Sequence, residues 1–158
     1  MKILLVSVVI VVIDQITKAL TRLNMDLYDS VPVIQNFFHL TYVTNDGMAF
    51  GLNFPGGIYV LSAVSIILTI VIFMYLWKER NGHFLMRLSL ALILAGAIGN
   101  LIDRVLFGKV VDFFDFMIGD FHWYIFNVAD SSVTVGMIIF LYFSFYIQPD
   151  LQPSETVE

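Results

Sequence analysis

Four long apolar stretches dominate this chain of 158 residues. They run over about 3–23, 58–77, 84–105 and 128–147, and each has roughly the 20 residues that an α-helix needs to cross a bilayer. Charged residues make up 13% of the chain, about half of the usual share in soluble domains. We therefore predict an all-α membrane protein with four transmembrane helices, built as a single domain over residues 1–158.

The segment of residues 24–57 is too polar to span a membrane. Within it, Phe37 to Val43 is rich in aromatic and β-branched residues, which predicts a strand. Thr44 to Gly47 predicts a turn, and Met48 to Leu52 a second short strand. Because an open sheet edge cannot lie in lipid, we expect a small β-sheet on the membrane surface between the first two helices.

Four spans place both termini on the same side of the membrane. Gln148-Pro149-Asp150 is expected to end the last helix, which leaves a polar tail over residues 148–158. Lysine and arginine usually mark the cytoplasmic side, but here four of them fall on each side. The orientation of the chain therefore does not follow from its basic residues.

Composition excludes several classes of function. The net charge of −5 argues against a nucleic-acid partner, which would need a basic face. The chain has no cysteine, so thiolate metal sites and cysteine nucleophiles are absent. Its three histidines are scattered without metal-ligand spacing, and we expect neither a metal nor a cofactor.

Polar residues gather at one end of the predicted bundle. Groups of this kind beside membrane spans are costly to keep and indicate a functional site. They come from four separate segments, which makes their convergence a stronger signal than any one of them. The set comprises Asp14, Asn45, Asn100, Asp103, Arg104, Asp112, Asn127 and Asp130.

Two of these aspartates are candidates for a catalytic pair. Asp112 and Asp130 flank the connector between the last two helices, so they can meet easily. Close carboxyl groups share a proton, and the ionised one can activate water while the protonated one supports a carbonyl oxygen. The N-terminus of a helix favours ionisation of Asp130. Spacing alone leaves Asp115 an equal rival of Asp112, and Asp103 a rival that neighbouring Arg104 can neutralise.

Each polar residue also has a simpler structural interpretation. Asp130 can serve as a helix cap, Asn45 as a turn residue, and Asn100 as an interhelical hydrogen-bonding group. Asp14 and Lys18 have the spacing of a helical ion pair, in which Lys18 would extend toward the membrane surface. We favour a structural role for this pair over a role in shaping the site.

A carboxylate pair that activates water, in a chain without a cysteine nucleophile or a predicted metal site, indicates peptide hydrolysis of the aspartic type. Three alternatives compete with this interpretation. Ser131 or Ser132 with Lys18 as base would make a serine–lysine peptidase, although both serines are more simply helix caps. An ion or proton transporter would need acidic residues across the bilayer, whereas these lie at one surface. A non-catalytic membrane assembly factor could use the small residues Ala91, Ala95 and Gly99 as a docking seam.

The polar motifs together resemble those of the lipoprotein signal peptidases, also called signal peptidase II, a family of bacterial membrane aspartic peptidases. The resemblance extends over nearly the whole chain and keeps the order of the family's motifs. The matching segments are Asp14-Gln15-Ile16-Thr17-Lys18, Asn45-Asp46-Gly47-Met48-Ala49-Phe50, Gly96-Ala97-Ile98-Gly99-Asn100-Leu101-Ile102-Asp103-Arg104, Val110-Val111-Asp112-Phe113 and Phe126-Asn127-Val128-Ala129-Asp130-Ser131.

The resemblance implies a role for each matching polar residue. Asp112 and Asp130 would be the catalytic dyad, which removes the ambiguity with Asp115. A second set would line the site, bind substrate or position the dyad, and it comprises Asn45, Gly99, Asn100, Arg104 and Asn127. Asp14 and Lys18 would support the architecture near the site.

The resemblance also implies a substrate and a location. The substrate would be a diacylglyceryl-modified prolipoprotein, cut just before its lipidated cysteine. The enzyme would be a multi-pass protein of the bacterial inner membrane, with cytoplasmic termini and an extracytoplasmic sheet and active site. Its partners would be this substrate and membrane lipids, and we expect a monomer. We further hypothesise that Arg104 pairs with lipid phosphates or substrate carbonyls, and that Phe50 and Trp123 lie against acyl chains.

Overall fold

The computed structural model describes residues 2–45, 57–119 and 121–151. Within these residues, four helices are long and apolar enough to cross a membrane. They agree with the four predicted spans to within one or two residues at most ends. Their bounds are Leu4–Asn24 for α1, Gly57–Lys78 for α2, Phe84–Phe107 for α3, and Val128–Tyr142 for α4, whose helical course continues beyond Tyr142.

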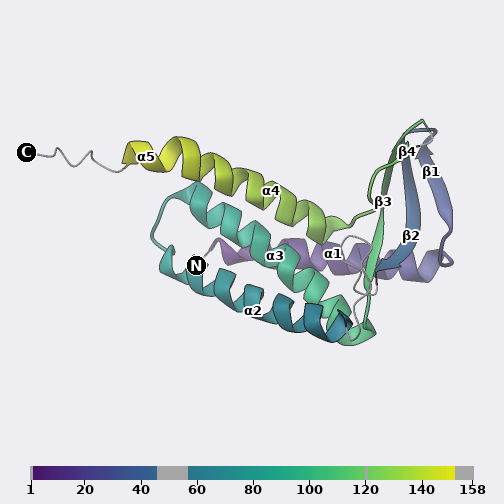
Figure 1. Cartoon of the computed structure of the whole chain (residues 1–158), viewed down its shortest axis with the longest axis horizontal. Helices are drawn as coiled ribbons and strands as arrows, with labels where there is room; N and C mark the ends of the chain where they lie inside the picture. The colour runs from purple at the N-terminus through teal and green to yellow at the C-terminus, as the bar shows by residue number, and fades with distance from the viewer. Residues whose placement is uncertain (1, 46–56, 120, 152–158) are drawn as a thin grey trace, which may run out of the picture.

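Helix α3 lies at the centre of the bundle and packs against α1, α2 and α4 (Figure 1). Small residues allow this close approach. Ala91 and Ala95 are fully buried, and a Cβ added at Gly96 would clash with the backbone of Ala129 on α4. The predicted seam of small residues on this helix is therefore a packing surface inside the bundle. By contrast, α2 is apolar all round and only 6% of its span is buried, as expected for a helix that faces lipid.

A four-stranded antiparallel sheet lies at one end of the bundle (Figure 1). Its strands follow in the order β1, β2, β3, β4. The two long central strands belong to different connections, because β2 follows α1 and β3 follows α3. The bounds are Ser30–Ile34 for β1, Phe38–Asn45 for β2, Val110–Ile118 for β3 and Phe121–His122 for β4.

The predicted sheet is confirmed, but its position in the chain was only half right. The strand expected at Phe37 to Val43 is β2, and Asn45 ends this strand instead of lying in a turn. The predicted strand at Met48 to Leu52 falls outside the described residues. The other half of the sheet comes from the connector between α3 and α4. Its run of valines and phenylalanines at the start of β3 is a strand signal that the polar-motif interpretation overlooked.

The expected break of the last helix at Gln148 is also wrong. After α4 the chain forms one π-helical turn over Phe143–Ile147 and then a short helix α5 over Gln148–Leu151. In the π turn the N–H of Gln148 donates to the carbonyl of Phe143. Pro149 then lies in the first turn of α5, where the missing proline N–H removes no hydrogen bond. Residues 152–158 of the predicted tail lie outside the described residues.

The beginning of α1 and the end of α5 lie at the end of the bundle opposite the sheet (Figure 1). This arrangement agrees with four consecutive spans. The buried apolar core also lies toward that end, where Leu76, Met86, Leu90 and Phe143 pack together. The polar residues that follow lie at the other end, beneath the sheet.

Candidate active site

Asp112 lies in β3 and its side chain is almost fully buried, with 3% exposed. Side chains along a strand alternate between its two faces, so Asp112 and Asp115 point to opposite sides of the sheet. The strand therefore separates the two rivals that spacing could not distinguish. Asp112 pairs across the sheet with Val43 of β2, and its side chain faces the helices.

Asp130 lies in the first turn of α4 and takes part in its N-cap. Asn127 is the capping residue, and its side-chain oxygen accepts a hydrogen bond of 2.9 Å from the N–H of Asp130. In return, Asp130 Oδ2 accepts from the backbone N–H of Asn127 at 3.3 Å. The structural role foreseen for Asp130 is thus present, and it fixes the orientation of the carboxylate.

Asn127 contacts both aspartates. Its Nδ2 donates to Asp112 Oδ1 at 2.6 Å, while its oxygen and backbone N–H bond to Asp130 as described. The sheet creates this arrangement, because Phe126 forms a backbone bridge with Phe114 of β3. That bridge places the start of α4 beside the strand that carries Asp112. Asn127 therefore bonds to both candidate catalytic carboxyl groups, to Asp112 through its side-chain amide and to Asp130 through its backbone N–H.

Asn100 of α3 bonds to the other oxygen of the Asp130 carboxylate. Its Nδ2 donates to Asp130 Oδ1 at 2.7 Å. Its side-chain oxygen accepts from Lys18 Nζ at 2.9 Å and from Asn127 Nδ2 at 3.2 Å. Asn100 thus makes the predicted interhelical hydrogen bond, and its partner is Asp130 itself.

Lys18 is completely buried, which contradicts the expectation that it extends to the membrane surface. Its ammonium group lies 2.9 Å from Asp14 Oδ2 and 3.3 Å from Asp103 Oδ2. The predicted pairing of Asp14 with Lys18 is therefore present, but inside the bundle. Asp103 is neutralised by Lys18, with Arg22 at 3.8 Å, and not by the adjacent Arg104 as expected. Two buried carboxylates hold the lysine inside by their charge.

This buried ion cluster also fastens the segments that carry the two candidate catalytic residues. Asp14 Oδ1 accepts from the N–H of Ala129 at 2.9 Å, next to Asp130. Asp103 Oδ2 accepts from the N–H of Val111 at 3.1 Å, next to Asp112. The ion cluster of Asp14, Lys18 and Asp103 therefore ties α1 and α3 to both the strand and the helix of the site.

The rival residues have partners elsewhere. Asp115 is buried on the other face of β3, where it bonds to His122 Nδ1 at 2.9 Å and to Thr41 Oγ1 at 2.7 Å. Ser131 Oγ and Ser132 Oγ donate to backbone carbonyls, of Asn127 and Leu92 respectively.

The ammonium of Lys18 directs its donors to Asp14, Asp103 and Asn100. A lysine can activate a serine only as a neutral base near the hydroxyl. The geometry therefore disfavours the serine–lysine alternative.

The remaining predicted residues border the same region. Asn45 Nδ2 donates to Tyr124 Oη at 3.0 Å. Arg104 Nη1 donates to Ser65 Oγ of α2 at 3.3 Å, and its charge acts on both Asp112 and Asp130. At Gly99 an added Cβ would lie 2.6 Å from Asp14 Oδ2, so the glycine makes room for the ion cluster. All nine predicted site residues thus lie at this end of the bundle.

The surroundings of Asp112 alter its ionisation. Burial raises the pKa of the Asp112 carboxyl to about 7, and the neighbouring charge of Asp130 contributes in the same direction. The hydrogen bond from Asn127 and the charge of Lys18 oppose this rise in pKa only in part. Asp112 therefore retains a proton up to near neutral pH.

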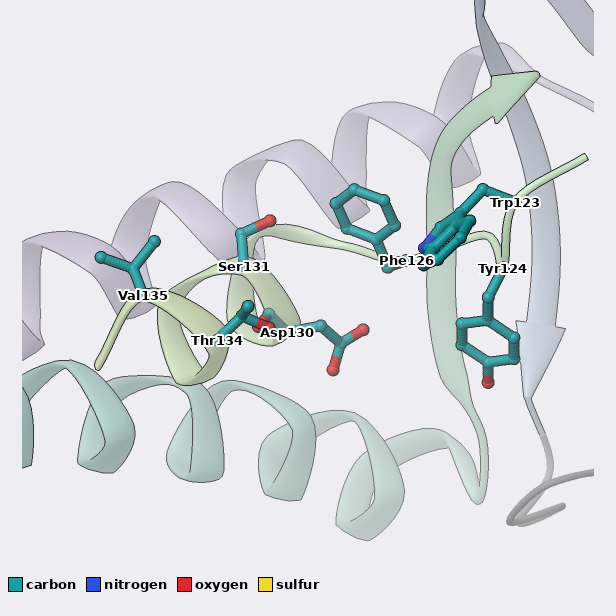
Figure 2. Close-up of a pocket in the computed structure, with 7 residues that line it drawn as sticks. All are labelled: Trp123, Tyr124, Phe126, Asp130, Ser131, Thr134 and Val135. Atoms are coloured by element: carbon teal, nitrogen blue, oxygen red, sulfur yellow. The ribbon is translucent and has the colours of Figure 1, made fainter. Parts of the chain in front are cut away.

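A pocket of about 430 Å³ opens beside Asp130. Aromatic residues from the connector before α4 form one side, and successive turns of α4 form the other (Figure 2). Its lining residues are Trp123, Tyr124, Phe126, Asp130, Ser131, Thr134 and Val135. Among the described residues no group of three or more histidines, aspartates or glutamates is placed to hold a metal ion.

Sequence reasoning missed several residues of this region. Nothing in the sequence assigns a role to Gln15, yet its Nε2 lies within 3.2 Å of both Asp14 and Asp103. Asp103 was seen as a rival catalytic residue and not as an anchor for β3. Tyr124 was not singled out, because nothing in a run of aromatic residues distinguishes one that faces a site. A prediction that β3 is a strand, and of its pairing partner, would have located these residues at the site.

The chain is similar to known proteins over most of its length. A family model described as signal peptidase (SPase) II matches residues 6–146. The lipoprotein signal peptidase of Desulforapulum autotrophicum is 44% identical over 93% of this chain and 94% of its own length. That of Moorella thermoacetica is 46% identical over 88% and 89% of the two chains. A solved bacterial membrane enzyme superposes with a TM-score of 0.79 at 34% identity, covering 99% of this chain and 94% of that one.

Proposed function

Because this chain belongs to the signal peptidase II family, we propose that it is a membrane aspartic endopeptidase acting on diacylglyceryl-modified prolipoproteins. Relatives at 44% and 46% identity are named lipoprotein signal peptidases, which supports a prolipoprotein substrate from which a signal peptide is removed. The cut would fall just before the lipidated cysteine. Because the family consists of peptidases, the transporter and the assembly-factor alternatives are disfavoured.

One observation carries the aspartic mechanism. Asp112 and Asp130 come from a strand and a helix, and Asn127 bonds to both carboxyl groups, with its side-chain Nδ2 on Asp112 and its backbone N–H on Asp130. A pair of carboxyl groups held in this way, at an end of the bundle that carries a pocket, fits peptide hydrolysis by water. The buried Asn127 fixes both side chains, so the pair is organised before substrate arrives.

We assign different roles to the two aspartates. Asp130 accepts N–H bonds from Asn100 and from the backbone of Asn127, and these donors stabilise its carboxylate form. It is the base that takes a proton from water. Asp112 holds its proton near neutral pH and donates a hydrogen bond to the scissile carbonyl oxygen. After attack by water, the proton taken up by Asp130 passes to the leaving nitrogen.

The surrounding residues act on the pair and on the substrate. Asn100 and Asn127 orient the carboxyl groups, while Asp14 and Lys18, with Gly99 giving them space, hold the helix and strand in place. Arg104 lies close enough to Asp112 and Asp130 for their charges to act on it, and Asn45 bonds to Tyr124, which lines the pocket beside Asp130. We propose that Arg104 binds substrate carbonyls or the phosphates of neighbouring lipids, and that Asn45 binds substrate backbone.

The site suits a substrate that enters from the bilayer. A lipidated signal peptide diffuses in the membrane, and the pocket beside Asp130 is walled by aromatic side chains and α4 (Figure 2). Trp123 in that wall is exposed and would lie against an acyl chain. The parallel role predicted for Phe50 concerns a residue outside those described.

The chain is a multi-pass membrane protein, and we propose the bacterial inner membrane as its location. Both termini would face the cytoplasm, with the sheet and the aspartates at the outer face. The separation of the chain ends from the sheet supports their placement on opposite sides of the membrane (Figure 1). We expect the protein to act as a monomer.

The proposed function is tested by incubating purified protein with a prolipoprotein peptide that carries a diacylglyceryl cysteine. Mass spectrometry should detect one cut, immediately before the modified cysteine. The same peptide without the lipid is the matched control and should be cleaved far more slowly. Cleavage at another bond, or equal cleavage of both peptides, would contradict the proposed substrate. Absence of any cleavage would contradict the peptidase assignment.

A further inference from the structure

Tyr124 lies beside the two aspartates and has no part in the function proposed above. It belongs to the connector between β4 and α4, its ring is exposed, and it lines the pocket that contains Asp130. Figure 2 shows the Asp130 carboxylate extending from α4 toward the side of the pocket on which Tyr124 lies. The phenol is thus in a position to meet whatever the aspartates act upon.

A single described hydrogen bond fixes the Tyr124 hydroxyl. Asn45 Nδ2 donates to Tyr124 Oη at 3.0 Å. A phenol oxygen can accept one hydrogen bond while it donates another. In this contact Tyr124 is the acceptor, and among the described residues it has no hydrogen bond in which it is the donor. Its proton is therefore left for a partner that enters the pocket.

The other side-chain hydroxyls of the pocket already donate hydrogen bonds to backbone carbonyls. Ser131 Oγ donates to the carbonyl of Asn127 at 2.8 Å, and Thr134 Oγ1 donates to the carbonyl of Asp130 at 2.9 Å. The indole N–H of Trp123 is the pocket's remaining side-chain donor besides Tyr124. No hydrogen bond among the described residues holds that indole in place, whereas Asn45 holds the phenol.

The phenol also lies within the electrostatic field of the catalytic region. Partial burial of the hydroxyl raises the pKa of Tyr124, and the charges of Asp112 and Asp130 raise it further. Both effects disfavour the phenolate form, so Tyr124 keeps its proton across the pH range in which the peptidase would work. A neutral phenol beside two carboxyl groups adds a donor to a site otherwise rich in acceptors.

We propose that the Tyr124 hydroxyl donates a hydrogen bond to a backbone carbonyl of the substrate next to the scissile bond, while Asn45 holds the phenol in place. An extended peptide offers a carbonyl at every residue, and the pocket between Tyr124 and Asp130 gives it room. This inference rests on the proposed peptidase function. It makes Tyr124 a substrate-binding residue that no family motif quoted above contains.

The test compares cleavage of the lipidated peptide by the natural protein and by Tyr124→Phe, which keeps the ring and removes the hydroxyl. Losing one neutral hydrogen bond should lower kcat/KM roughly threefold to tenfold. The matched control is Tyr142→Phe, the same change at the far end of α4 on an exposed side chain. Its kcat/KM should equal that of the natural protein.

A second comparison tests whether a substrate carbonyl is the partner of the Tyr124 hydroxyl. Peptides are made in which one amide near the cleavage site, but not the scissile one, is replaced by an ester, whose carbonyl is a weaker acceptor. If Tyr124 bonds to that carbonyl, the loss caused by Tyr124→Phe should shrink for one of these peptides. The same loss with every peptide, or no loss at all, would overturn the inference. Failure of the natural protein to cleave any peptide would instead overturn the proposed function.

Discussion

Asp112 shows how the surroundings of one residue prepare it for chemistry. An exposed aspartate would be ionised at pH 7, but burial and the nearby charge of Asp130 raise the pKa of Asp112 to about 7. Asn127 donates a hydrogen bond to the Asp112 side chain and another to that of Asp130. The resulting carboxyl group can hold a proton near neutral pH, as the proposed role of Asp112 as a hydrogen-bond donor requires.

This pKa predicts the pH dependence of cleavage. Below about pH 7 Asp112 is protonated and can donate to the scissile carbonyl, and as the pH rises through this value the proton is lost. The value of kcat/KM should therefore fall on the alkaline side, approaching about tenfold per pH unit. Initial rates at low concentrations of lipidated peptide, measured in constant ionic strength from pH 5 to pH 9, check this. A rate that rises steadily through pH 7 to 9 would contradict the assigned role of Asp112.

Lys18 is the residue whose loss should affect the site from a distance. Lys18→Met keeps a long apolar side chain but leaves Asp14 and Asp103 buried together without their cation. Breaking a buried ion cluster in this way should lower the free energy of unfolding by roughly 3–5 kcal/mol. Cleavage should fall as well, because the cluster fastens both aspartate-bearing segments. Thermal melting in detergent and peptide cleavage measure the two effects.

Lys109 provides the comparison for Lys18. It lies exposed in the turn between α3 and β3, so Lys109→Met removes the same charge without disturbing a buried cluster. Its melting temperature and cleavage rate should stay near those of the natural protein. If Lys18→Met behaved like Lys109→Met, the ion cluster would have no part in holding the site.

At the scale of elements, the helices could be predicted well and the sheet only in part. Stretches of about twenty mostly apolar residues leave few alternatives to a membrane-spanning helix, and the predicted bounds are close. The strand β3 escaped prediction because its aspartates were interpreted as a polar connector. Pairing with β2 depends on residues about 70 positions away, which no local pattern contains. Without this strand, the choice between Asp112 and Asp115 rested on the family resemblance alone.

Burial of the Asp14–Lys18 pair could not be predicted for a related reason. Spacing of four residues on one helix fits either an exposed or a buried pair. Whether the pair is exposed or buried depends on Asp103 of α3, which also contacts the ammonium group of Lys18. Tertiary packing therefore changed the predicted surface pair into a buried anchor.

The contact between α1, α3 and α4 predicts a cost for enlarging Gly99. In Gly99→Ala the added Cβ would lie 2.6 Å from Asp14 Oδ2. The other carboxylate oxygen of Asp14 accepts a hydrogen bond from the N–H of Ala129. Overpacking of this kind costs about 1–3 kcal/mol, and cleavage should fall because the start of α4 shifts. Thermal melting and the cleavage assay measure both quantities.

Gly108 gives a comparator that separates stability from activity. It has a φ of 70° at the end of α3, and an added Cβ there would meet open space. Gly108→Ala should cost roughly 1–2 kcal/mol from backbone strain but leave the cleavage rate at low temperature nearly unchanged. Equal effects of the two substitutions on cleavage would show that Gly99 has no special relation to the site.

At the scale of the whole molecule, four helices carry a sheet at one end and the chain ends at the other (Figure 1). The ionisable residues of the site therefore lie at one membrane surface. Helix α2 is apolar along its length. A peptidase for lipid-anchored substrates needs this asymmetry, because its substrate lies in one leaflet. The proposed outer-face location of the site therefore depends on which end of the bundle faces outward.

Labelling of introduced cysteines determines that orientation, since the natural chain has none. Asp29→Cys places a thiol just before β1 at the sheet end, and Asn81→Cys places one in the turn between α2 and α3 at the opposite end. In intact cells a membrane-impermeant maleimide should label Asp29→Cys and spare Asn81→Cys. Both should react after the membrane is opened with detergent. Labelling of Asn81→Cys alone would reverse the proposed topology.

The account as a whole depends on Asp112 and Asp130 acting together as the group that splits the peptide. The most direct measurement is the cleavage rate of the lipidated peptide by Asp112→Asn, Asp130→Asn and Asp115→Asn, each checked for its melting temperature. Asp115→Asn makes the same change in the same strand on the opposite face of the sheet. We predict a loss of at least about a thousandfold for the first two variants and continued cleavage by the third. Cleavage that survives in Asp112→Asn or Asp130→Asn, or is lost in a folded Asp115→Asn, would contradict the account.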